Sequence, residues 1–244
     1  MTADCMYVRG STVIFLGPPG CGKGTQAARL SSELQIPAIS TGEILRQACQ
    51  SGSELGKMVR SVLESGQLVG DELMNQVVSQ RLLEADCQDG CILDGYPRTV
   101  PQAHFLSGWL HDRRLPRPLV IDFDLDDSEI VKRLSRRRSC GQCGQVYGAH
   151  RQTGAPQKFC EADGSRLLQR SDDRPEVISA RLRIYKANAD QLVSYFGGQN
   201  YLRLPAAGSP DEVAGELALL LGLRTASPTV SHLNGLTARA AYSV

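Results

Sequence analysis

A glycine- and proline-rich segment at residues 17–25 reads G-P-P-G-C-G-K-G-T and contains a single lysine. The apolar run at residues 12–16 before it predicts a buried strand, and residues 26–34 after it predict a helix. The free backbone N–H groups and the positive end of the helix dipole then point into the loop, where they can bind a polyphosphate. Lys23 can reach the outermost phosphates, and the Thr25 hydroxyl can help to hold the magnesium that accompanies them.

The position of that hydroxyl is a variant of the usual phosphate-loop pattern. Ser or Thr normally follows the lysine directly, whereas here Gly24 intervenes before Thr25. A glycine-rich turn between a strand and a helix can also bind nothing. The strand, the helix and Lys23 together favour phosphate binding over a plain turn.

Length and composition predict one α/β domain that works inside the cell. A chain of 244 residues, 41% of them hydrophobic, can bury a sizeable core. The formal net charge of +1 argues against non-specific nucleic-acid binding, which needs a clear basic excess. No apolar run approaches the roughly 18 residues of a membrane span, and residues 1–11 lack the apolar stretch of a signal peptide, so we expect a cytoplasmic protein. The eight cysteines are then expected as free thiols or metal ligands rather than disulfides.

A short second strand is predicted at residues 36–40, and a helical excursion follows it. Thr41 is expected to cap the first of its helices. The expected helices span residues 41–49, 52–66 and 71–83. Arg46 lies on the first helix, where it is either a solvated charge or part of a binding site.

The third strand, residues 90–94, ends on an acid and is followed by the turn G-Y-P-R-T. In a parallel sheet, ligands bind beyond the carboxyl ends of the strands, so Asp94 and Arg98 are expected near the phosphate loop. Asp94 can reach magnesium through its water molecules, and Arg98 offers a planar pair of donors to a phosphate. The Gln102 amide can donate to and accept from the edge of a base. The alternative is that Arg98 and Gln102 are ordinary surface residues.

A fourth strand is expected at residues 119–125, followed by a helix that Ser128 caps. This helix runs into several arginines, of which Arg133 and Arg137 are four residues apart and are expected to share one helical face. Such a run usually faces solvent. An anion site would explain why the positive charge is concentrated in an otherwise neutral chain.

Two pairs of metal-binding residue types come next, Cys140 with Cys143 and Cys160 with Asp163. Each pair is separated by two residues and followed by glycine, which is typical of a closed, four-coordinate structural zinc site. A carboxylate is a good zinc ligand, but Asp163 could equally be a turn residue, which would leave three sulfurs or no site. The pattern shows no open position for a catalytic water.

The C-terminal part predicts a long helix, a fifth strand and a last helix. Asp173 is expected to cap the long helix at residues 175–196, which carries Arg181. The strand and the last helix are expected at residues 200–204 and 211–221. Residues 224–244 are rich in Ser, Thr and Ala without clear periodicity, and we expect them to form a disordered tail.

Six motifs, in this order, closely resemble those of adenylate kinases of the long-lid type. They read G-P-P-G-C-G-K-G-T, S-T-G-E-I-L-R, L-V-G-D-E, L-D-G-Y-P-R-T-V-P-Q, R-L-S-R-R-R and R-S-D-D-R-P-E-V-I-S-A-R-L. The resemblance covers about residues 12–221. It implies an α/β fold of the P-loop NTPase type, with a five-stranded parallel sheet flanked by helices. It also implies reversible, magnesium-dependent phosphoryl transfer from ATP to AMP, giving two ADP.

The resemblance further implies how the chain is divided. Residues 1–223 would form a single nucleoside-monophosphate kinase domain, followed by the tail. The implied parts are a core at residues 12–39, 70–135 and 174–223, an inserted helical AMP-binding part at residues 40–69, and a lid at residues 136–173. The cysteine pairs resemble the zinc-bearing lids of many bacterial members, which implies a structural zinc ion there.

Carried over position by position, the resemblance implies the following site residues. ATP would be held by Gly20, Cys21, Gly22, Lys23, Gly24, Thr25 and Arg133, and in some relatives its adenine is touched at the positions of Val146, Tyr147 and Ser209. AMP would be held by Thr41, Arg46, Gln67, Leu68, Val69, Gly95, Tyr96, Pro97, Arg98, Gln102, Arg170 and Arg181. Catalysis would involve Lys23, Asp94, Arg98, Arg133, Arg137, Arg170 and Arg181. Tyr96 stands where Phe is commoner in the family, which would add a hydroxyl near AMP.

Two other functions fit parts of the sequence. One is a kinase for another nucleoside monophosphate, or an AMP kinase that uses GTP as donor, although Thr41 and Gln102 favour AMP by resemblance. The other is a non-enzymatic nucleotide sensor, against which Lys23, Asp94 and the arginines speak. We expect a monomer that binds ATP, AMP and ADP and neither nucleic acid nor membrane.

Overall fold

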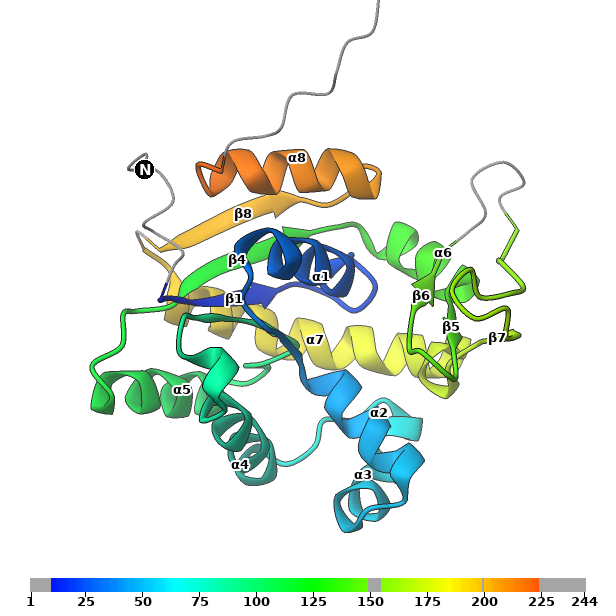
Figure 1. The fold of residues 1–244 in the computed structure, drawn as a ribbon, viewed down its shortest axis with the longest axis horizontal. Helices are drawn as coiled ribbons and strands as arrows, with labels where there is room; N and C mark the ends of the chain where they lie inside the picture. Colours follow the sequence, from blue (N-terminus) through cyan, green and yellow to red (C-terminus); the bar gives the residue numbers. More distant parts are fainter. Residues whose placement is uncertain (1–9, 149–154, 199, 224–244) are drawn as a thin grey trace, which may run out of the picture.

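The computed structural model describes residues 10–148, 155–198 and 200–223, and its centre is a five-stranded parallel sheet (Figure 1). The strand order is β2-β3-β1-β4-β8. The strands are β1 (Thr12–Leu16), β2 (Ala38–Ser40), β3 (Cys91–Asp94), β4 (Leu119–Asp124) and β8 (Tyr201–Pro205). The expected fold class is confirmed, while the tail expected at residues 224–244 lies outside the described residues.

The central strand β1 shows why this sheet forms. All five of its residues are buried, as expected for a parallel strand that is covered on both faces. Ile14 lies opposite Leu93 of β3 and Val120 of β4, so apolar side chains are matched across three strands. Phe15 lies opposite Asp94, and this register places the acid at the level where β1 passes into the phosphate loop.

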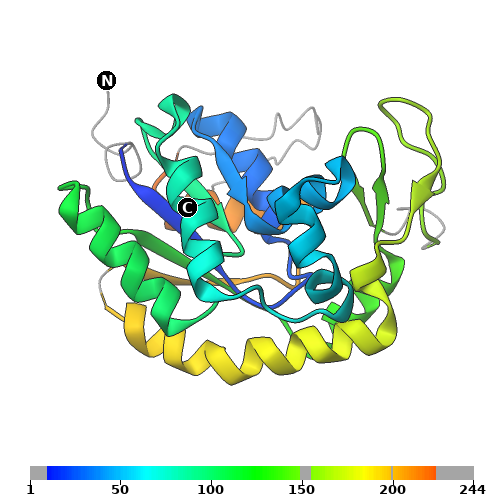
Figure 2. The same cartoon turned by 90° about the horizontal axis from the view of Figure 1, so that it is seen from below.

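Helices cover both faces of the sheet (Figures 1 and 2). They are α1 (Lys23–Leu34), α2 (Thr41–Ser51), α3 (Glu54–Ser65), α4 (Asp71–Leu82), α5 (Val100–Asp112), α6 (Asp127–Arg136), α7 (Pro175–Phe196) and α8 (Pro210–Leu220), with short 3-10 turns η2 (Ala85–Cys87) and η3 (Ser171–Asp173). Phe15 packs with Leu30 of α1 and Val213 of α8 on one face. Ile14 packs with residues of α4, α5 and α7 on the other. The two cores hold the carboxyl ends of the strands in a fixed arrangement.

Two segments extend from the carboxyl ends of the strands. One consists of α2 and α3, and the other, the lid, contains the antiparallel strands β5 (Arg138–Cys140), β6 (Val146–Tyr147) and β7 (Leu167–Leu168) in the order β6-β5-β7. The lid lies against α2, because a Cβ placed on Gly144 would be 3.6 Å from the carboxylate of Glu43. The two segments therefore meet above the sheet.

Three predicted helix caps are wrong. Thr41 is the first residue of α2, and its hydroxyl donates to the Gly95 carbonyl at 2.9 Å instead of capping the helix. Ser128 lies inside α6, whose N-cap is Asp126. Asp173 precedes the N-cap of α7, and its carboxylate is bound by arginines. The side chains of Thr41 and Asp173 thus bond to partners in other parts of the fold and not to a backbone N–H group at the start of their helix.

The element boundaries otherwise lie close to those expected, with α1 beginning at Lys23 rather than at Gln26. Lys23 is therefore part of the helix that follows the phosphate loop. Every helix in the described ranges is too short or too polar to cross a membrane.

Candidate active site

A cavity of about 1210 Å³ lies at the carboxyl ends of the strands. Its walls are formed by the phosphate loop, α2, the lid and α7. Ligand pockets usually have volumes of about 300–1,000 Å³, so this cavity has room for more than one ligand of nucleotide size. The predicted site residues on its walls are Gly20, Cys21, Gly22, Lys23, Gly24, Thr25, Arg46, Leu68, Asp94, Gly95, Pro97, Arg98, Arg133, Arg137, Val146, Tyr147, Arg170 and Arg181.

The phosphate loop leads into the N-terminus of α1. Gly22 is the N-cap, in the left-handed conformation with φ 107°, and no side chain caps the first turn. The first N–H groups are therefore available to an anion. Lys23 Nζ donates to the carbonyl oxygens of Gly17 and Pro18, both at 2.7 Å. A phosphate could replace these neutral acceptors with charged ones, to which an ammonium group binds more strongly.

Asp94 lies beside the first turn of α1. One of its carboxylate oxygens is 3.3 Å from the point where a Cβ on Gly24 would lie. The next residue, Thr25, is exposed on the same turn. Carboxylate and hydroxyl oxygens are ligands of the kind that magnesium prefers, directly or through water. The donor set at this point therefore fits a magnesium ion carried by a nucleotide.

Eight arginines of the described chain line the cavity. Five of them, from different parts of the chain, are Arg46, Arg98, Arg137, Arg170 and Arg181. Burial lowers the pKa of both Arg170 and Arg181 to about 10, so both remain protonated at neutral pH. Cations that are packed together and partly desolvated are unfavourable by themselves. An anion in the cavity would offset both the desolvation and the mutual repulsion.

Two acids just before α7 hold some of these arginines. The fully buried Asp173 accepts hydrogen bonds from Arg137 at 2.7 and 2.5 Å and lies 3.4 Å from Arg181. Asp172 pairs with Arg181 at 3.0 Å. Burial alone would raise the pKa of Asp172, but the neighbouring arginines outweigh it, and the pKa falls below its usual value. Sequence reasoning missed this role, although two adjacent acids between arginines are a visible signal.

Arg133 and Arg137 do not share a helical face, contrary to the prediction. α6 ends before Arg137, whose extended backbone (φ −64°, ψ 137°) leads out of the helix, and its side chain bonds to Asp173. Arg133 stays on α6 and donates to the carbonyl oxygens of Ala207 at 3.0 Å and Cys21 at 3.5 Å. Arg133 therefore joins the phosphate loop to the loop before α8.

Arg46 and Arg98 are each held by a local partner. Arg46 donates to one carboxylate oxygen of Glu43 at 3.0 and 3.3 Å. Arg98 donates through Nε to the Gly95 carbonyl at 2.8 Å. A guanidinium group has five N–H donors, so each side chain keeps further donors for an anion in the cavity.

Some predicted site residues do not reach the wall of the cavity in the part of the chain that the structure describes. They are Thr41, Gln67, Val69, Tyr96, Gln102 and Ser209. Ser209 forms a capping box with Glu212 at the start of α8, while its neighbours Gly208 and Pro210 line the cavity. Val69 is buried in the core shared with α4 and α5.

Gln102 and Tyr96 have their polar groups occupied elsewhere. The buried Gln102 amide accepts from the Arg98 backbone N–H and donates to the Asp71 carboxylate, both at 2.8 Å. The Tyr96 hydroxyl donates to Asn75 at 2.6 Å, and burial raises its pKa. In this structure the Tyr96 hydroxyl therefore belongs to the core, and its expected position near AMP stays a prediction.

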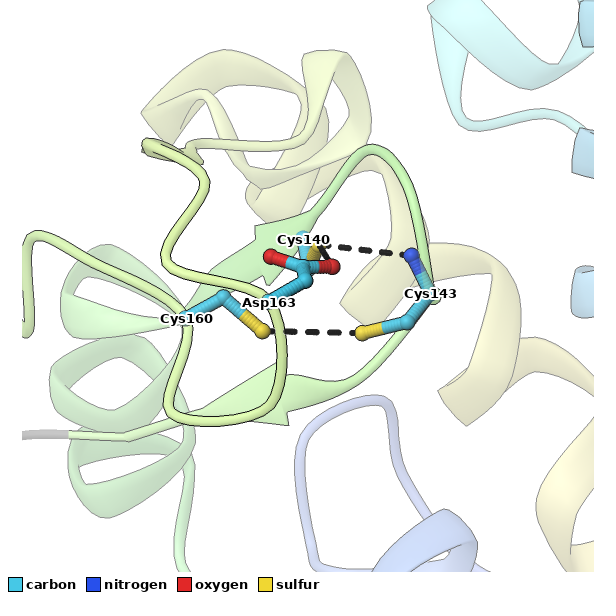
Figure 3. Close-up of side chains that lie close together, drawn as sticks. All are labelled: Cys140, Cys143, Cys160 and Asp163. Carbon is cyan, nitrogen blue, oxygen red and sulfur yellow. Dashed lines mark hydrogen bonds between the residues drawn. The ribbon is translucent and has the colours of Figure 1, made fainter.

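The lid brings together the four predicted metal ligands, Cys140, Cys143, Cys160 and Asp163 (Figure 3). Their ligand atoms all lie within 4.8 Å of one another. The Sγ atoms of Cys143 and Cys160 are 3.6 Å apart, and Cys140 Sγ is 3.2 Å from an Asp163 carboxylate oxygen. Around a tetrahedral zinc ion with Zn–S of about 2.3 Å and Zn–O of about 2.0–2.2 Å, ligand atoms are separated by about 3.5–3.8 Å. The donor set thus fits one such ion.

Comparison with known proteins identifies the family. The family model for adenylate kinase matches residues 15–201. An adenylate kinase of Petrotoga mobilis is 41% identical over 210 residues, which cover 86% of this chain and 96% of that protein. An adenylate kinase of Fervidobacterium nodosum is 42% identical over 211 residues, which cover 86% and 97%. The chain belongs to the adenylate kinase family.

These matches confirm the family that the six sequence motifs indicated, and they agree with the P-loop fold of the structure. The similarity spans nearly the whole length of these relatives, so the excursion and the lid both fall within it. This adenylate kinase family member therefore has the phosphate loop, the arginine cluster and the lid around one cavity.

The buried pairing of Asp173 makes a testable contribution to stability. In Asp173→Asn the two arginines lose a charged partner, and we expect the free energy of unfolding to fall by about 3 kcal/mol. For a chain of this size the melting temperature should fall by roughly 6–12 °C. Asp124→Asn is the control, because Asp124 pairs with Arg203 at the surface and such pairs contribute about 1 kcal/mol or less. Equal melting temperatures for the two variants would contradict this role of Asp173.

Proposed function

We propose that this chain catalyses reversible, magnesium-dependent transfer of the γ-phosphoryl group of ATP to AMP, giving two ADP. One observation carries the proposal: a phosphate loop with Lys23 and a set of arginines line the same cavity. A loop of this kind binds a nucleoside triphosphate, and the arginines suit a second phosphate and the charge that moves between the two. The adenylate kinase names of the relatives support ATP and AMP as the substrates.

The proposal divides the site residues between two nucleotides. ATP is assigned to the phosphate loop from Gly20 to Thr25, with Arg133 beside it. AMP is assigned to the wall that contains Arg46, Leu68 and Arg98. The predicted contacts of Thr41, Gln67, Val69, Tyr96 and Gln102 with AMP, and of Ser209 with ATP, would require movement or backbone groups, because these residues do not line the cavity.

The chain need not supply a nucleophile, because a phosphate oxygen of AMP attacks the γ-phosphorus. Catalysis then consists of positioning the two nucleotides in line and stabilising the charge on the transferring group. Lys23 and the N–H groups of α1 hold the donor phosphates, and Arg137, Arg170 and Arg181 neutralise the equatorial oxygens. Magnesium, when bound near Asp94 and Thr25, neutralises further phosphate charge.

Exclusion of water is the second task of the protein. We assign it to the excursion at residues 40–69 and to the lid at residues 136–173, which close over the core. The short distance between Gly144 and Glu43 supports this assignment, because it places the lid against the excursion. A closed cavity keeps water from hydrolysing ATP, and its reopening can limit turnover.

We propose that the protein is a monomer that acts in the cytoplasm. The described cysteines are free thiols, which fits a reducing compartment.

The proposed reaction is tested by measuring ADP formed from ATP and each nucleoside monophosphate in turn. We expect magnesium-dependent ADP formation with AMP, and much slower transfer to UMP, CMP and GMP or from GTP. Lys23→Met is the matched control and should lose transfer, because it removes the charge at the donor phosphates. Use of UMP or CMP at least as fast as AMP would refute the assignment. ATP binding without any transfer would favour a nucleotide sensor.

A second prediction concerns Arg46. In Arg46→Ala the AMP phosphate loses charged hydrogen bonds worth about 1.5–3 kcal/mol, so KM for AMP should rise about 10- to 100-fold. KM for ATP should change little, because the donor site is elsewhere. Arg183→Ala removes the same charge from an exposed position on α7 and is the control. Steady-state kinetics with each nucleotide varied separates these effects, and an unchanged KM for AMP would show that Arg46 has been misassigned.

We also propose that Cys140, Cys143, Cys160 and Asp163 bind one structural zinc ion. Three thiolates and a carboxylate are a sufficient set for zinc, and they leave no open position for chemistry. The lid has a small apolar core, so metal binding would contribute directly to its folding.

Removing the metal should therefore loosen the lid. Chelation, or Cys143→Ser, should lower the melting temperature of the lid, while the phosphate loop still binds ATP. Cys49→Ser is the control, because Cys49 lies on α2 outside the lid. Metal analysis of protein prepared without chelator, together with melting curves, provides the measurement. Reduced protein that contains no stoichiometric metal, or that loses no stability on chelation, would rule the site out.

A further inference from the structure

Tyr147 of β6 connects two regions of the lid. The residue lies on the wall of the cavity, yet it is only 7% exposed. Its hydroxyl oxygen lies 3.3 Å from Cys160 Sγ and 2.9 Å from Gln145 Oε1, and it accepts the Glu161 backbone N–H at 2.9 Å. One residue therefore lies at both the cavity and a proposed metal ligand.

The hydroxyl has one proton and two possible acceptors. Gln145 Oε1 is a neutral acceptor. Cys160 Sγ is a weak acceptor as a thiol, but a metal-bound Cys160 is a thiolate and carries negative charge. A hydrogen bond to a charged acceptor is about twice as strong as one to a neutral acceptor. Metal binding should therefore turn the hydroxyl proton from Gln145 toward Cys160.

We propose that Tyr147 is a positioning residue that donates its hydroxyl proton to the Cys160 thiolate of the metal-loaded lid. The bond fixes the ligand sulfur and, through the same ring, fixes part of the cavity wall. This inference rests on the proposed zinc site and adds an outer-sphere partner to it. Groups of this kind orient the ligands and tune the metal, and their loss typically lowers metal affinity by about 10- to 100-fold.

Ser165 provides a comparison within the same lid. Its hydroxyl oxygen lies 3.0 Å from Cys140 Sγ, so it is placed to support another ligand. Ser165 is not among the residues that line the cavity in the described chain. Losing the Ser165 hydroxyl should therefore weaken metal binding without changing nucleotide binding, whereas losing the Tyr147 hydroxyl should affect both.

The experiment uses the full-length protein with Zn²⁺ or Co²⁺ as the probe. Zinc affinity is measured by competition with a chromogenic chelator for the wild type, Tyr147→Phe, Ser165→Ala and the control Tyr195→Phe. We expect Tyr147→Phe to bind zinc about 10-fold more weakly and Tyr195→Phe to be unchanged, because Tyr195 lies on α7 outside the lid. KM for ATP should rise in Tyr147→Phe but not in Ser165→Ala.

The cobalt form distinguishes a bond to sulfur from a general loosening of the lid. Removing a hydrogen bond from a thiolate raises the energy of its lone pairs, so the sulfur-to-cobalt charge-transfer band of Tyr147→Phe should move to longer wavelength. Gln145→Ala should leave that band in place, because it removes only the other acceptor. An unshifted band in Tyr147→Phe, or an unchanged zinc affinity, would overturn the proposal. An unchanged KM for ATP would overturn the link to the cavity.

The result also separates this inference from the proposals on which it rests. A wild-type protein that binds neither metal would overturn the zinc site and the role of Tyr147 together, while ADP formation would still test the kinase assignment independently. Equal zinc affinities of the wild type and Tyr147→Phe would overturn the role of Tyr147 alone.

Discussion

Positive charge gathered around one cavity is the constraint on which the rest of this structure depends. Partly desolvated arginines repel one another more strongly than they would in water, and the chain must offset that cost before any nucleotide arrives. Asp172 and Asp173, in the short turn η3 before α7, offset part of this cost. Their position matters because Asp173 joins Arg137, at the N-terminal end of the lid, to Arg181 in the core. One buried carboxylate thus holds the charge cluster together and attaches the lid to the sheet domain.

A second constraint is the close approach of the phosphate loop to its surroundings. A Cβ on Gly17 would lie 2.7 Å from the Phe123 carbonyl oxygen, and one on Gly20 would lie 2.7 Å from the Leu134 side chain. Glycine is therefore required at both positions for packing as well as for the positive φ angles. The loop can wrap a phosphate because it is pressed against β4 and α6, which also carries Arg133. Packing and anion binding are thus two results of the same backbone path.

The sequence predicted features that depend on local patterns. Such features are the apolar strands, the phosphate loop and the two ligand pairs of the lid. Each corresponds to a short motif whose geometry is set by a few neighbouring residues. Two of the wrong predictions share a different cause. Thr41 and Asp173 are polar residues whose partners, Gly95 and Arg137, come from other elements. Local capping propensities do not reveal such partners, which become visible only when the sheet brings the elements together.

The lid shows how a small segment can be ordered without a large core. Among the described residues its buried cluster consists of Cys140, Tyr147, Cys160 and Leu167, and two of these four are proposed metal ligands. Ordering the backbone costs about 1–2 kcal/mol per residue, which so few side chains cannot offset by apolar burial alone. The remaining stabilisation must come from bonds to a metal or from contacts with the core. The first would make the lid rigid within itself, and the second includes the charged contact of Arg137 with Asp173. A lid that a metal made rigid would move as one body, which is what the proposed opening and closing of the cavity requires.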